Sequence, residues 1–161
     1  MIKAIMAVDQ SWGAGKNGTL PWPANKEDLK QFKDKTTGHI VIMGSNTWFD
    51  PCFPAPLKNR INIVVTTNPD KFDDREVIIT STPIATIEEL SKIHQNKDVW
   101  IIGGINLIDQ CWNIIEEFHL TIINGHYDCD KFLDFQQLED NFTLIQGDIL
   151  DNAYYIYRRA I

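Results

Sequence analysis

The residue type best suited to chemistry in this sequence is a carboxylate, Asp28, on a helix predicted over Glu27–Lys35. Asp28 precedes Phe32 by one turn and adjoins Leu29, so the spacing places all three on one face of that helix. The helix dipole favours acidic residues in the first turn, which is enough to explain the presence of Glu27. Asp28 differs because it shares its face of the helix with apolar side chains. We expect this face to be buried, which disfavours the charged form of a carboxylate unless a partner compensates. Such a group is suited to binding a polar heterocycle or to holding a proton near neutral pH.

Two glycine-containing turns, each following an apolar strand, predict contact with an anionic ligand. Gly103 and Gly104 end the run that begins at Trp100. Gly44 ends the run His39–Met43, and a short helix with polar capping residues follows it. Glycine allows the backbone to approach a phosphate closely. Either turn alone is weak evidence, and the two together are able to bind the two ends of a dinucleotide.

A third glycine-rich stretch, Gly13–Gly18, has the pattern G-x-G-x-x-G of dinucleotide-binding turns. That motif requires a strand before it and a helix that opens at its last glycine. The run Ile2–Val8 supplies the strand, but Pro21 and Pro23 prevent a helix from following. We therefore reject the dinucleotide motif here and interpret Gly13–Thr19 as a mobile loop that closes over a ligand.

Short apolar runs and intervening helical patterns indicate the fold that positions these residues. The predicted strands are Ile2–Val8, His39–Met43, Arg60–Thr66, Val77–Thr80, Val99–Ile102, Phe118–Asn124, Phe142–Gln146 and Tyr154–Arg158. The predicted helices are Glu27–Lys35, Thr86–Gln95 with a capping box Thr86-x-x-Glu89, and Asn106–Ile115. Strands and helices alternate at first, and the chain closes with strands alone. We predict a single α/β domain over residues 1–161, with a central, mostly parallel mixed sheet of about eight strands, an antiparallel C-terminal strand and about four flanking helices.

Composition limits the partners and the compartment. The 161 residues have a formal net charge of −7 and 43% hydrophobic residues, which is typical of a globular protein and argues against nucleic acid or an anionic membrane as a partner. No signal-peptide-like or membrane-spanning run is present. Cys52, Cys111 and Cys129 fit no zinc module, so we expect reduced thiols, a cytoplasmic protein and no metal.

Several motifs in one order give the sequence a family resemblance. They are Gly15-Lys16-Asn17-Gly18-x-Leu20-Pro21-Trp22, Asp28-Leu29-x-x-Phe32, Met43-Gly44-x-x-Thr47-Trp48, Pro56-Leu57-x-x-Arg60-x-Asn62, Ile102-Gly103-Gly104 and Leu120-Thr121. Taken together, the chain resembles the dihydrofolate reductases over nearly its whole length. The resemblance implies NADPH-dependent reduction of 7,8-dihydrofolate to 5,6,7,8-tetrahydrofolate, with hydride passing from nicotinamide C4 to pterin C6. It also implies a role in one-carbon and thymidylate metabolism, and a monomer.

On the substrate side, the resemblance assigns catalytic roles to four residues. Asp28 would bind the pterin with Thr121 as its hydroxyl partner, Trp22 would hold a water near that carboxylate, and Leu20 would close over the ring. The family's apolar slot corresponds to Ile5, Ala7, Leu29, Phe32, Leu57 and Ile102. Arg60 would bind the α-carboxylate of the glutamate tail, which suits the guanidinium fork.

On the cofactor side, the family positions correspond to Ala7, Gly15, Leu20, Gly44, Ser45, Asn46, Thr47, Thr66, Thr67, Ile102, Gly103, Gly104, Asn106 and Leu107. Ser45, Asn46 and Asn106 stand where basic residues are usual, and the turn expected to receive the 2′-phosphate has the uncharged Thr66 and Thr67. These replacements leave NADH open as an alternative cofactor. Further departures are Ile108 in place of a tyrosine and Asp50 with Pro51 at the substrate rim, while Lys71 and Arg75 could supply the missing charge.

Two other functions fit parts of the sequence. One is a reductase of the same fold that acts on another pterin or a pyrimidine, and Asp28 together with Leu20-Pro21-Trp22 argues against it. The other is a non-catalytic cofactor-binding or assembly component. The replacement of basic residues on the cofactor side allows this second function. A non-catalytic protein would, however, have no use for the substrate-side residues Trp22, Asp28, Arg60 and Thr121.

Overall fold

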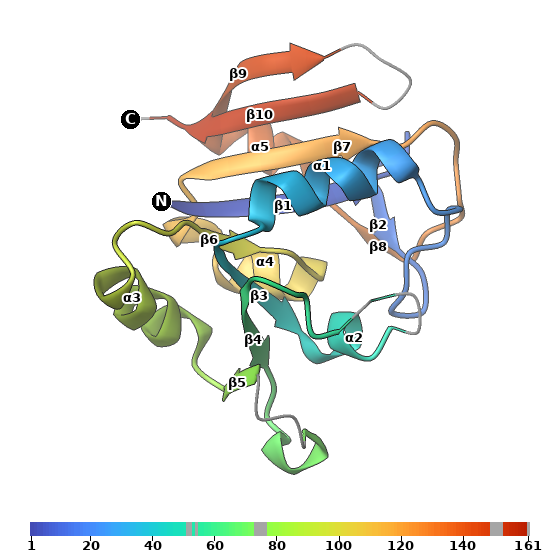
Figure 1. Cartoon of the computed structure of the whole chain (residues 1–161). Coiled ribbons are helices and arrows are strands. Elements are labelled where there is room, and N and C mark those ends of the chain that lie inside the picture. Colours follow the sequence, from blue (N-terminus) through green and yellow to red (C-terminus); the bar gives the residue numbers. More distant parts are fainter. Residues whose placement is uncertain (51–52, 54, 73–76, 149–152, 161) are drawn as a thin grey trace.

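The computed structural model describes residues 1–50, 53, 55–72, 77–148 and 153–160 (Figure 1). Strands within these residues are β1 (Ile2–Val8), β2 (Gly13–Gly15), β3 (Ile40–Gly44), β4 (Ile61–Val65), β5 (Val77–Thr80), β6 (Val99–Ile101), β7 (Glu117–Ile122), β8 (Lys131–Phe132), β9 (Phe142–Asp148) and β10 (Ala153–Arg159). Helices are α1 (Lys26–Thr36), α2 (Ser45–Trp48), α3 (Pro83–Ile93), α4 (Ile105–Gln110) and α5 (Phe135–Asn141), with 3₁₀ turns η1 (Pro69–Lys71) and η2 (Trp112–Ile114).

Eight strands form one sheet in the order β5-β4-β3-β6-β1-β7-β10-β9. The pairs from β5 to β7 are all parallel, and β10 is antiparallel to both β7 and β9. This confirms the predicted mostly parallel sheet with an antiparallel strand close to one edge. Because the carboxyl ends of the parallel strands share one edge, loops after β1, β3, β4 and β6 meet there.

The two faces of the sheet have different covers (Figure 1). Helices α3, α4 and α5 bury their apolar side chains against one face, in a core that includes Ile87, Ile108 and Leu138. Helix α1 lies on the other face, where a smaller apolar cluster includes Ile5, Leu57 and the half-buried Phe32. In the described residues of α1, only Thr36 is buried. Helix α1 therefore covers the sheet incompletely, which leaves its inner face available to a ligand.

The predicted capping box at Thr86 is wrong. Helix α3 begins one turn earlier, because Pro83 is suited to the first helical position and Thr82 precedes it as N-cap. Thr86 instead lies inside the helix, where its hydroxyl donates to the Thr82 carbonyl over 3.0 Å. The chain thus enters α3 directly after β5.

The C-terminal third is also less regular than predicted. The expected helix Asn106–Ile115 is the short α4 followed by η2. The expectation of strands alone after that point is wrong, because α5 intervenes. Its N-cap Asp134 accepts a 3.0 Å bond from the Gln137 N–H. Five α-helices are therefore described in place of about four.

The glycine-rich stretch that we expected to be a mobile loop forms a hairpin. Strand β2 pairs with β8, and the N–H and carbonyl groups of Lys16 and Thr19 bond to each other across a turn. The central residues Asn17 and Gly18 have φ values of 51° and 79°, as a two-residue hairpin turn requires. No helix opens at Gly18, since α1 begins only at Lys26, which agrees with our rejection of the dinucleotide motif.

No helix in the described ranges is long and apolar enough to cross a membrane.

Candidate active site

Asp28 lies in the first turn of α1, on the side of the helix that faces the sheet. Asn25 caps this helix, and its side chain accepts a 3.0 Å bond from the Asp28 N–H. Asp28 is half-buried, whereas Leu29 is 53% exposed. The prediction of a fully buried face is therefore wrong, because α1 borders an opening and not the main core.

Thr121, on β7, is the partner of the Asp28 carboxylate. Burial raises the pKa of Asp28, and a hydrogen bond from the Thr121 side chain acts in the opposite direction. Thr121 is 2% exposed and lies opposite Ala7 in the pairing of β1 with β7. A poorly hydrated acid with one hydroxyl partner can bind a cationic or amidine-like ring edge and can also hold a proton.

Four of the six predicted slot residues belong to one apolar cluster under α1. Ile5 and Leu57 are buried in it, and Phe32 and Ile102 pack against it. Ala7 is half-buried at the end of β1, next to Thr121. Leu29 lies at the exposed edge of this region. The structure therefore brings an apolar wall and a carboxylate to the same face of the sheet.

Trp22 and Leu20 lie on the segment between the hairpin and α1. Trp22 is 8% exposed and contacts Tyr127 edge-on, with ring centroids 6.0 Å apart. Leu20 is 55% exposed. An apolar side chain that is exposed in this way is available to cover a ligand in the opening beside it.

The hairpin before Leu20 is tied to the loop before β8. The Asp130 N–H donates to the Gly15 carbonyl over 2.9 Å, and the Asp130 side chain accepts from the Asn17 N–H over 3.0 Å. Asp9, 1% exposed, bonds to backbone N–H groups of Ser11, Gly13 and Tyr127. Sequence analysis did not identify Asp9 or Asp130, because their bonds to Tyr127 and Asn17 join segments distant in sequence.

Arg60 connects β4 to the C-terminal end of α1. Its Nη1 donates to Thr36 Oγ1 over 3.0 Å, its Nε donates to the Lys58 carbonyl over 3.0 Å, and its guanidinium lies 5.9 Å from the Phe32 ring centroid. Burial lowers the pKa of Arg60. The guanidinium group nevertheless stays charged at neutral pH. These bonds fix the fork while other N–H groups of the guanidinium remain able to bind a carboxylate.

Gly44 and Gly103 lie side by side at the carboxyl ends of β3 and β6. The Gly44 N–H donates to the Gly103 carbonyl over 2.9 Å. Gly103 has φ +124°, and a Cβ there would stand 3.9 Å from Thr47 Oγ1. A Cβ on Gly104 would meet no atom within 4 Å. The two predicted turns therefore meet in one backbone surface, in which Gly104 is exposed, Gly44 is half-buried and Gly103 is buried.

Two further predicted cofactor residues flank this surface, and a third does not face it. Ser45 is half-buried and Asn46 is exposed, with the Asn46 side chain 3.7 Å from the position of a Cβ on Gly18. Leu107 is 4% exposed in the main core, and its N–H already donates to the Gly104 carbonyl. Leu107 therefore supports the turn from below.

The remaining positions differ in how far the structure describes them. Asn106 is exposed, and Ile108 is fully buried in the main core. Thr66 and Thr67 follow β4, where the Thr66 N–H bonds to the Thr80 carbonyl, and Lys71 lies nearby in η1. Asp50 is half-buried after α2. Pro51, Cys52 and Arg75 lie outside the described residues.

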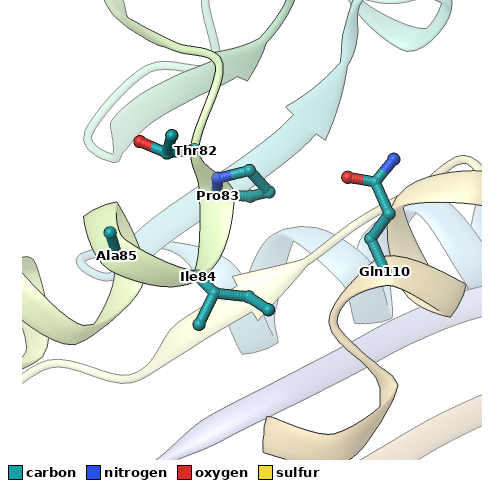
Figure 2. A pocket seen from close by; sticks show the side chains of 5 residues that line it. All are labelled: Thr82, Pro83, Ile84, Ala85 and Gln110. Carbon is teal, nitrogen blue, oxygen red and sulfur yellow. The ribbon is translucent and has the colours of Figure 1, made fainter.

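A separate hollow of about 350 Å³ opens between the N-terminus of α3 and α4 (Figure 2). Its lining residues are Thr82, Pro83, Ile84, Ala85 and Gln110. The lining is mostly apolar, with one side-chain amide. Thr80, whose carbonyl accepts from the Thr66 N–H, ends β5, and Thr82 of the hollow follows two residues later, so the hollow adjoins the carboxyl end of β5.

Sequence analysis did not identify Glu117, His119 or Tyr154 as site residues. These buried polar side chains form a hydrogen-bonded group close to Asp28. The signal that could have found them is the alternation of polar residues, Glu117, His119 and Thr121, within an apolar strand.

Among the described residues, no group of His, Cys, Asp and Glu is arranged to hold a metal ion. Cys111 and Cys129 are free thiols, and burial raises the pKa of Cys111 to about 11.

Glycine turns at the carboxyl ends of β3 and β6, together with a partly buried carboxylate on the helix that covers the sheet, define an α/β protein with sites for a nucleotide and a polar ring. Comparison with known proteins gives the family. The family model for dihydrofolate reductase matches residues 1–153, and the chain belongs to this family.

Two curated relatives and one solved structure illustrate the match. The chain is 32% identical to the dihydrofolate reductase of Ureaplasma parvum over 157 residues, which covers 98% of this chain and 96% of that protein. It is 32% identical to the enzyme of Bos taurus over 152 residues, covering 84% and 81%. A dihydrofolate reductase structure from Enterococcus faecalis, complexed with NADP(H) and RAB-propyl, aligns with a TM-score of 0.78 and 26% identity, covering 100% of this chain and 97% of that one.

Proposed function

We propose that this chain is an NADPH-dependent oxidoreductase that reduces 7,8-dihydrofolate to 5,6,7,8-tetrahydrofolate. Membership of the dihydrofolate reductase family supports this activity. The observation that carries the proposal is the Asp28–Thr121 pair, a poorly hydrated carboxylate beside the open ends of β1 and β6. The carboxylate binds the ring, and the strand ends hold the cofactor.

The substrate lies along the inner face of α1. Asp28 binds the amino and ring-nitrogen edge of the pterin, and Arg60 binds the carboxylate of the glutamate tail. Asp28 and the Arg60 partner Thr36 are eight residues apart on this helix, which separates them by about 12 Å along its axis. Phe32 lies between them and offers an apolar surface to the middle of the substrate.

Asp28 stabilises the positive charge that develops on the pterin, while Trp22 holds a water near the carboxylate and Leu20 excludes bulk water. NADPH, when bound, supplies the hydride to pterin C6, and a proton reaches N5. The contribution of the chain is orientation, exclusion of water and a fixed charge. None of these residues forms a covalent bond to the substrate.

The residues at the carboxyl ends of β3, β4 and β6 fit a dinucleotide. Gly44, Gly103 and Gly104 present backbone without side chains, and the space next to Gly104 is open. Ala7 and Ile102 would contact the nicotinamide end, and Gly15 would support Leu20 over it. Ser45, Asn46, Thr47 and Asn106 would bind the phosphates, with Leu107 supporting that turn.

The adenosine end would lie toward Thr66, Thr67 and the hollow beside α3. The apolar residues Pro83 and Ile84 and the Gln110 amide suit a flat heterocycle with polar edges. Because Thr66 and Thr67 are uncharged, NADH serves as a weaker second cofactor. We further propose a cytoplasmic monomer, with residues 1–161 as one domain and neither nucleic acid nor membrane as a partner.

The test is loss of dihydronicotinamide absorbance with purified protein and dihydrofolate, measured in parallel with NADPH and NADH. We expect turnover with NADPH, slower turnover with NADH, and loss of most turnover in Asp28→Asn. The matched control is Glu27→Gln, which changes the neighbouring exposed acid of the same helix turn. Near-normal turnover of Asp28→Asn would disprove the role of Asp28, and folded wild-type protein without turnover would disprove the activity.

A further inference from the structure

Three buried polar side chains behind Asp28 have no role in the reaction as proposed above. They are Glu117, His119 and Tyr154, with exposed fractions of 6%, 2% and 4%. Buried ionisable groups are costly unless they are bonded to one another. All three lie on the sheet face that α1 covers, on the neighbouring strands β7 and β10.

These side chains form one hydrogen-bonded chain. His119 Nε2 lies 2.6 Å from Glu117 Oε1, and His119 Nδ1 bonds to the Tyr154 hydroxyl. At the far end, Arg158 Nη2 lies 3.2 Å from Glu117 Oε2, and Lys3 Nζ lies 3.7 Å from Glu117 Oε1. The chain thus runs from a cationic end at Lys3 and Arg158 to the Tyr154 hydroxyl.

The charges in the chain fix the direction of its hydrogen bonds. Burial lowers the pKa of His119 and outweighs the opposing effect of Glu117, and Lys3 and Lys35 lower this pKa further, so His119 is neutral at neutral pH. Burial alone would raise the pKa of Glu117, but bonds to His119 and Arg158 bring it below its usual value. A charged Glu117 requires the proton of neutral His119 on Nε2, so Nδ1 accepts and the Tyr154 hydroxyl donates.

The register of the strands places Tyr154 beside the Asp28 site. Tyr154 pairs with Thr121, and Thr121 pairs with Ala7 on its other side. Thr121 is also the hydroxyl partner of Asp28. Burial raises the pKa of Tyr154, and the negative charges of Glu117 and Asp28 raise it further, so both acids act electrostatically on this hydroxyl.

We propose that Glu117, His119 and Tyr154 are positioning residues for the Asp28 carboxyl: they hold the Tyr154 hydroxyl with its proton on His119 and its lone pairs toward Asp28, where they favour the protonated form of that acid. This inference rests on the proposed function, in which Asp28 binds the substrate. The hydroxyl proton is committed to His119, so the oxygen can accept a hydrogen bond but cannot donate one toward Asp28. The three hydrogen-bonded side chains therefore determine the pH at which Asp28 ionises.

Other groups around this chain come from four elements. From β1, Lys3 contacts Glu117 and also Asp98, with its Nζ 3.1 Å from the Asp98 carboxylate. From α1, Lys35 Nζ lies 6.0 Å from the Tyr154 ring centroid. From β6, Trp100 contacts His119 edge-on, with ring centroids 4.8 Å apart.

From β10, Arg158 completes this set of neighbours. It contacts the Glu117 end, as Lys3 does, whereas Lys35 is the cation near Tyr154. Tyr154 is therefore the member of the group that bonds to His119 and also neighbours Thr121 in the strand register, and Tyr154→Phe removes its hydroxyl while keeping the ring.

The decisive measurement is the titration of Asp28 in protein without ligands. NMR of carboxyl-labelled aspartate follows each acid, and Asp28→Asn assigns the signal. We expect Tyr154→Phe to lower the Asp28 titration midpoint by about half a pH unit or more, because a neighbour that accepts from the protonated acid has been removed. The control is Tyr157→Phe, the same change on the same strand but at a residue that packs in the opposite core, and we expect no shift. A midpoint in Tyr154→Phe that is unchanged or raised would overturn the inference.

A second variant tests whether His119 acts through Tyr154. His119→Phe removes the acceptor and frees the Tyr154 hydroxyl to donate to Asp28, so the midpoint should fall further than in Tyr154→Phe. In the double variant, His119→Phe should add nothing to Tyr154→Phe. If the two single variants shift the Asp28 midpoint equally and their shifts add in the double variant, the role of His119 is overturned. Thermal unfolding verifies that each variant is folded.

Turnover separates this inference from the proposed function. If the wild type reduces dihydrofolate, the pH profile of the hydride-transfer rate should move in Tyr154→Phe by the same amount as the Asp28 midpoint. A profile that stays in place while the midpoint moves would overturn the link to the reaction. If the wild type shows no turnover while the NMR midpoint still shifts, the proposed function has failed and the control of Asp28 by Tyr154 stands.

Discussion

Arg60 Nη1 donates a 3.0 Å hydrogen bond to Thr36 Oγ1, joining the start of β4 to the last turn of α1. The bond orients the guanidinium beside Phe32 on the helix that also positions Asp28. Thr36 in turn donates its hydroxyl to the Phe32 carbonyl over 2.8 Å. The proposed sites for the two ends of the substrate are therefore connected through one helix.

Arg60→Lys should weaken substrate binding much more than catalysis. Lysine keeps the charge but loses the fork that binds a carboxylate through two N–H groups. We expect KM for dihydrofolate to rise by about 10- to 100-fold, which corresponds to a charged hydrogen bond of about 1.5–3 kcal/mol, with kcat changed only a few-fold. Steady-state kinetics measures both quantities. A dihydropterin without the glutamate tail serves as the control substrate, and a comparable loss with it would contradict the assigned role.

Asn62 should support the same end of the site through its amide. The side chain is 2% exposed, its Oδ1 accepts from the Leu57 N–H, and its Nδ2 donates to the carbonyls of Leu57 and Arg60 at 2.9 and 3.0 Å. Asn62→Asp removes the donors and leaves two carbonyls facing a carboxylate. We expect a loss of about 2–4 kcal/mol in the free energy of unfolding, measured by urea denaturation. Dihydrofolate affinity should fall more than NADPH affinity, and an equal fall in both would show a general loss of structure.

Asp28→Asn should make the protein more stable at neutral pH although it abolishes most turnover. Burial raises the pKa of Asp28 in the folded protein, so the folded state binds more protons than the unfolded state between the two pKa values. Stability from this group is therefore full below the unfolded pKa and falls as pH rises through the folded pKa. Thermal unfolding at several pH values should show the Asn variant gaining on the wild type as pH increases. A constant difference across the pH range would show that Asp28 ionises as it does in the unfolded chain.

Thr67→Lys should increase the preference for NADPH over NADH. Thr67 is exposed in the turn after β4, and the proposed site for the 2′-phosphate has the uncharged side chains of Thr66 and Thr67 there. One added cation gives a charge-assisted hydrogen bond, so we expect the NADPH/NADH ratio of kcat/KM to rise by about tenfold at low salt and by less at high salt. Thr143→Lys, on the exposed edge strand β9, is the matched control for net charge. An equal effect of both variants would indicate long-range attraction in place of a local contact.

The sequence predicted the strands well because they depend on local pattern. Continuous apolar runs are typical of strands buried on both faces, and β3 is such a strand, with four buried residues before Gly44. The prolines at 21 and 23 were enough to exclude a dinucleotide-binding helix after Gly18. Boundaries were less accurate where two local signals competed, as at α3, where Pro83 begins the helix ahead of the apparent capping box at Thr86.

Short elements held by distant partners were not predictable in this way. Strand β2 exists through its pairing with β8 and through bonds from Gly15 and Asn17 to Asp130. Helix α5 has seven residues and buries only Leu138 among them, so its apolar pattern is weak. In both cases the stabilising contacts come from residues far apart in the chain.

By itself, the sequence determined the order of strands and helices, the glycine turns after β3 and β6, and the position of Asp28 on the inner side of α1. These follow from residue spacing and backbone preference, which act over a few residues. Only the tertiary structure decided that Thr121 pairs with Tyr154 and that His119 and Glu117 extend from this pair. Strand register depends on hydrogen bonds between distant segments and on burial of whole faces, so the environment of Asp28 is a property of the assembled sheet.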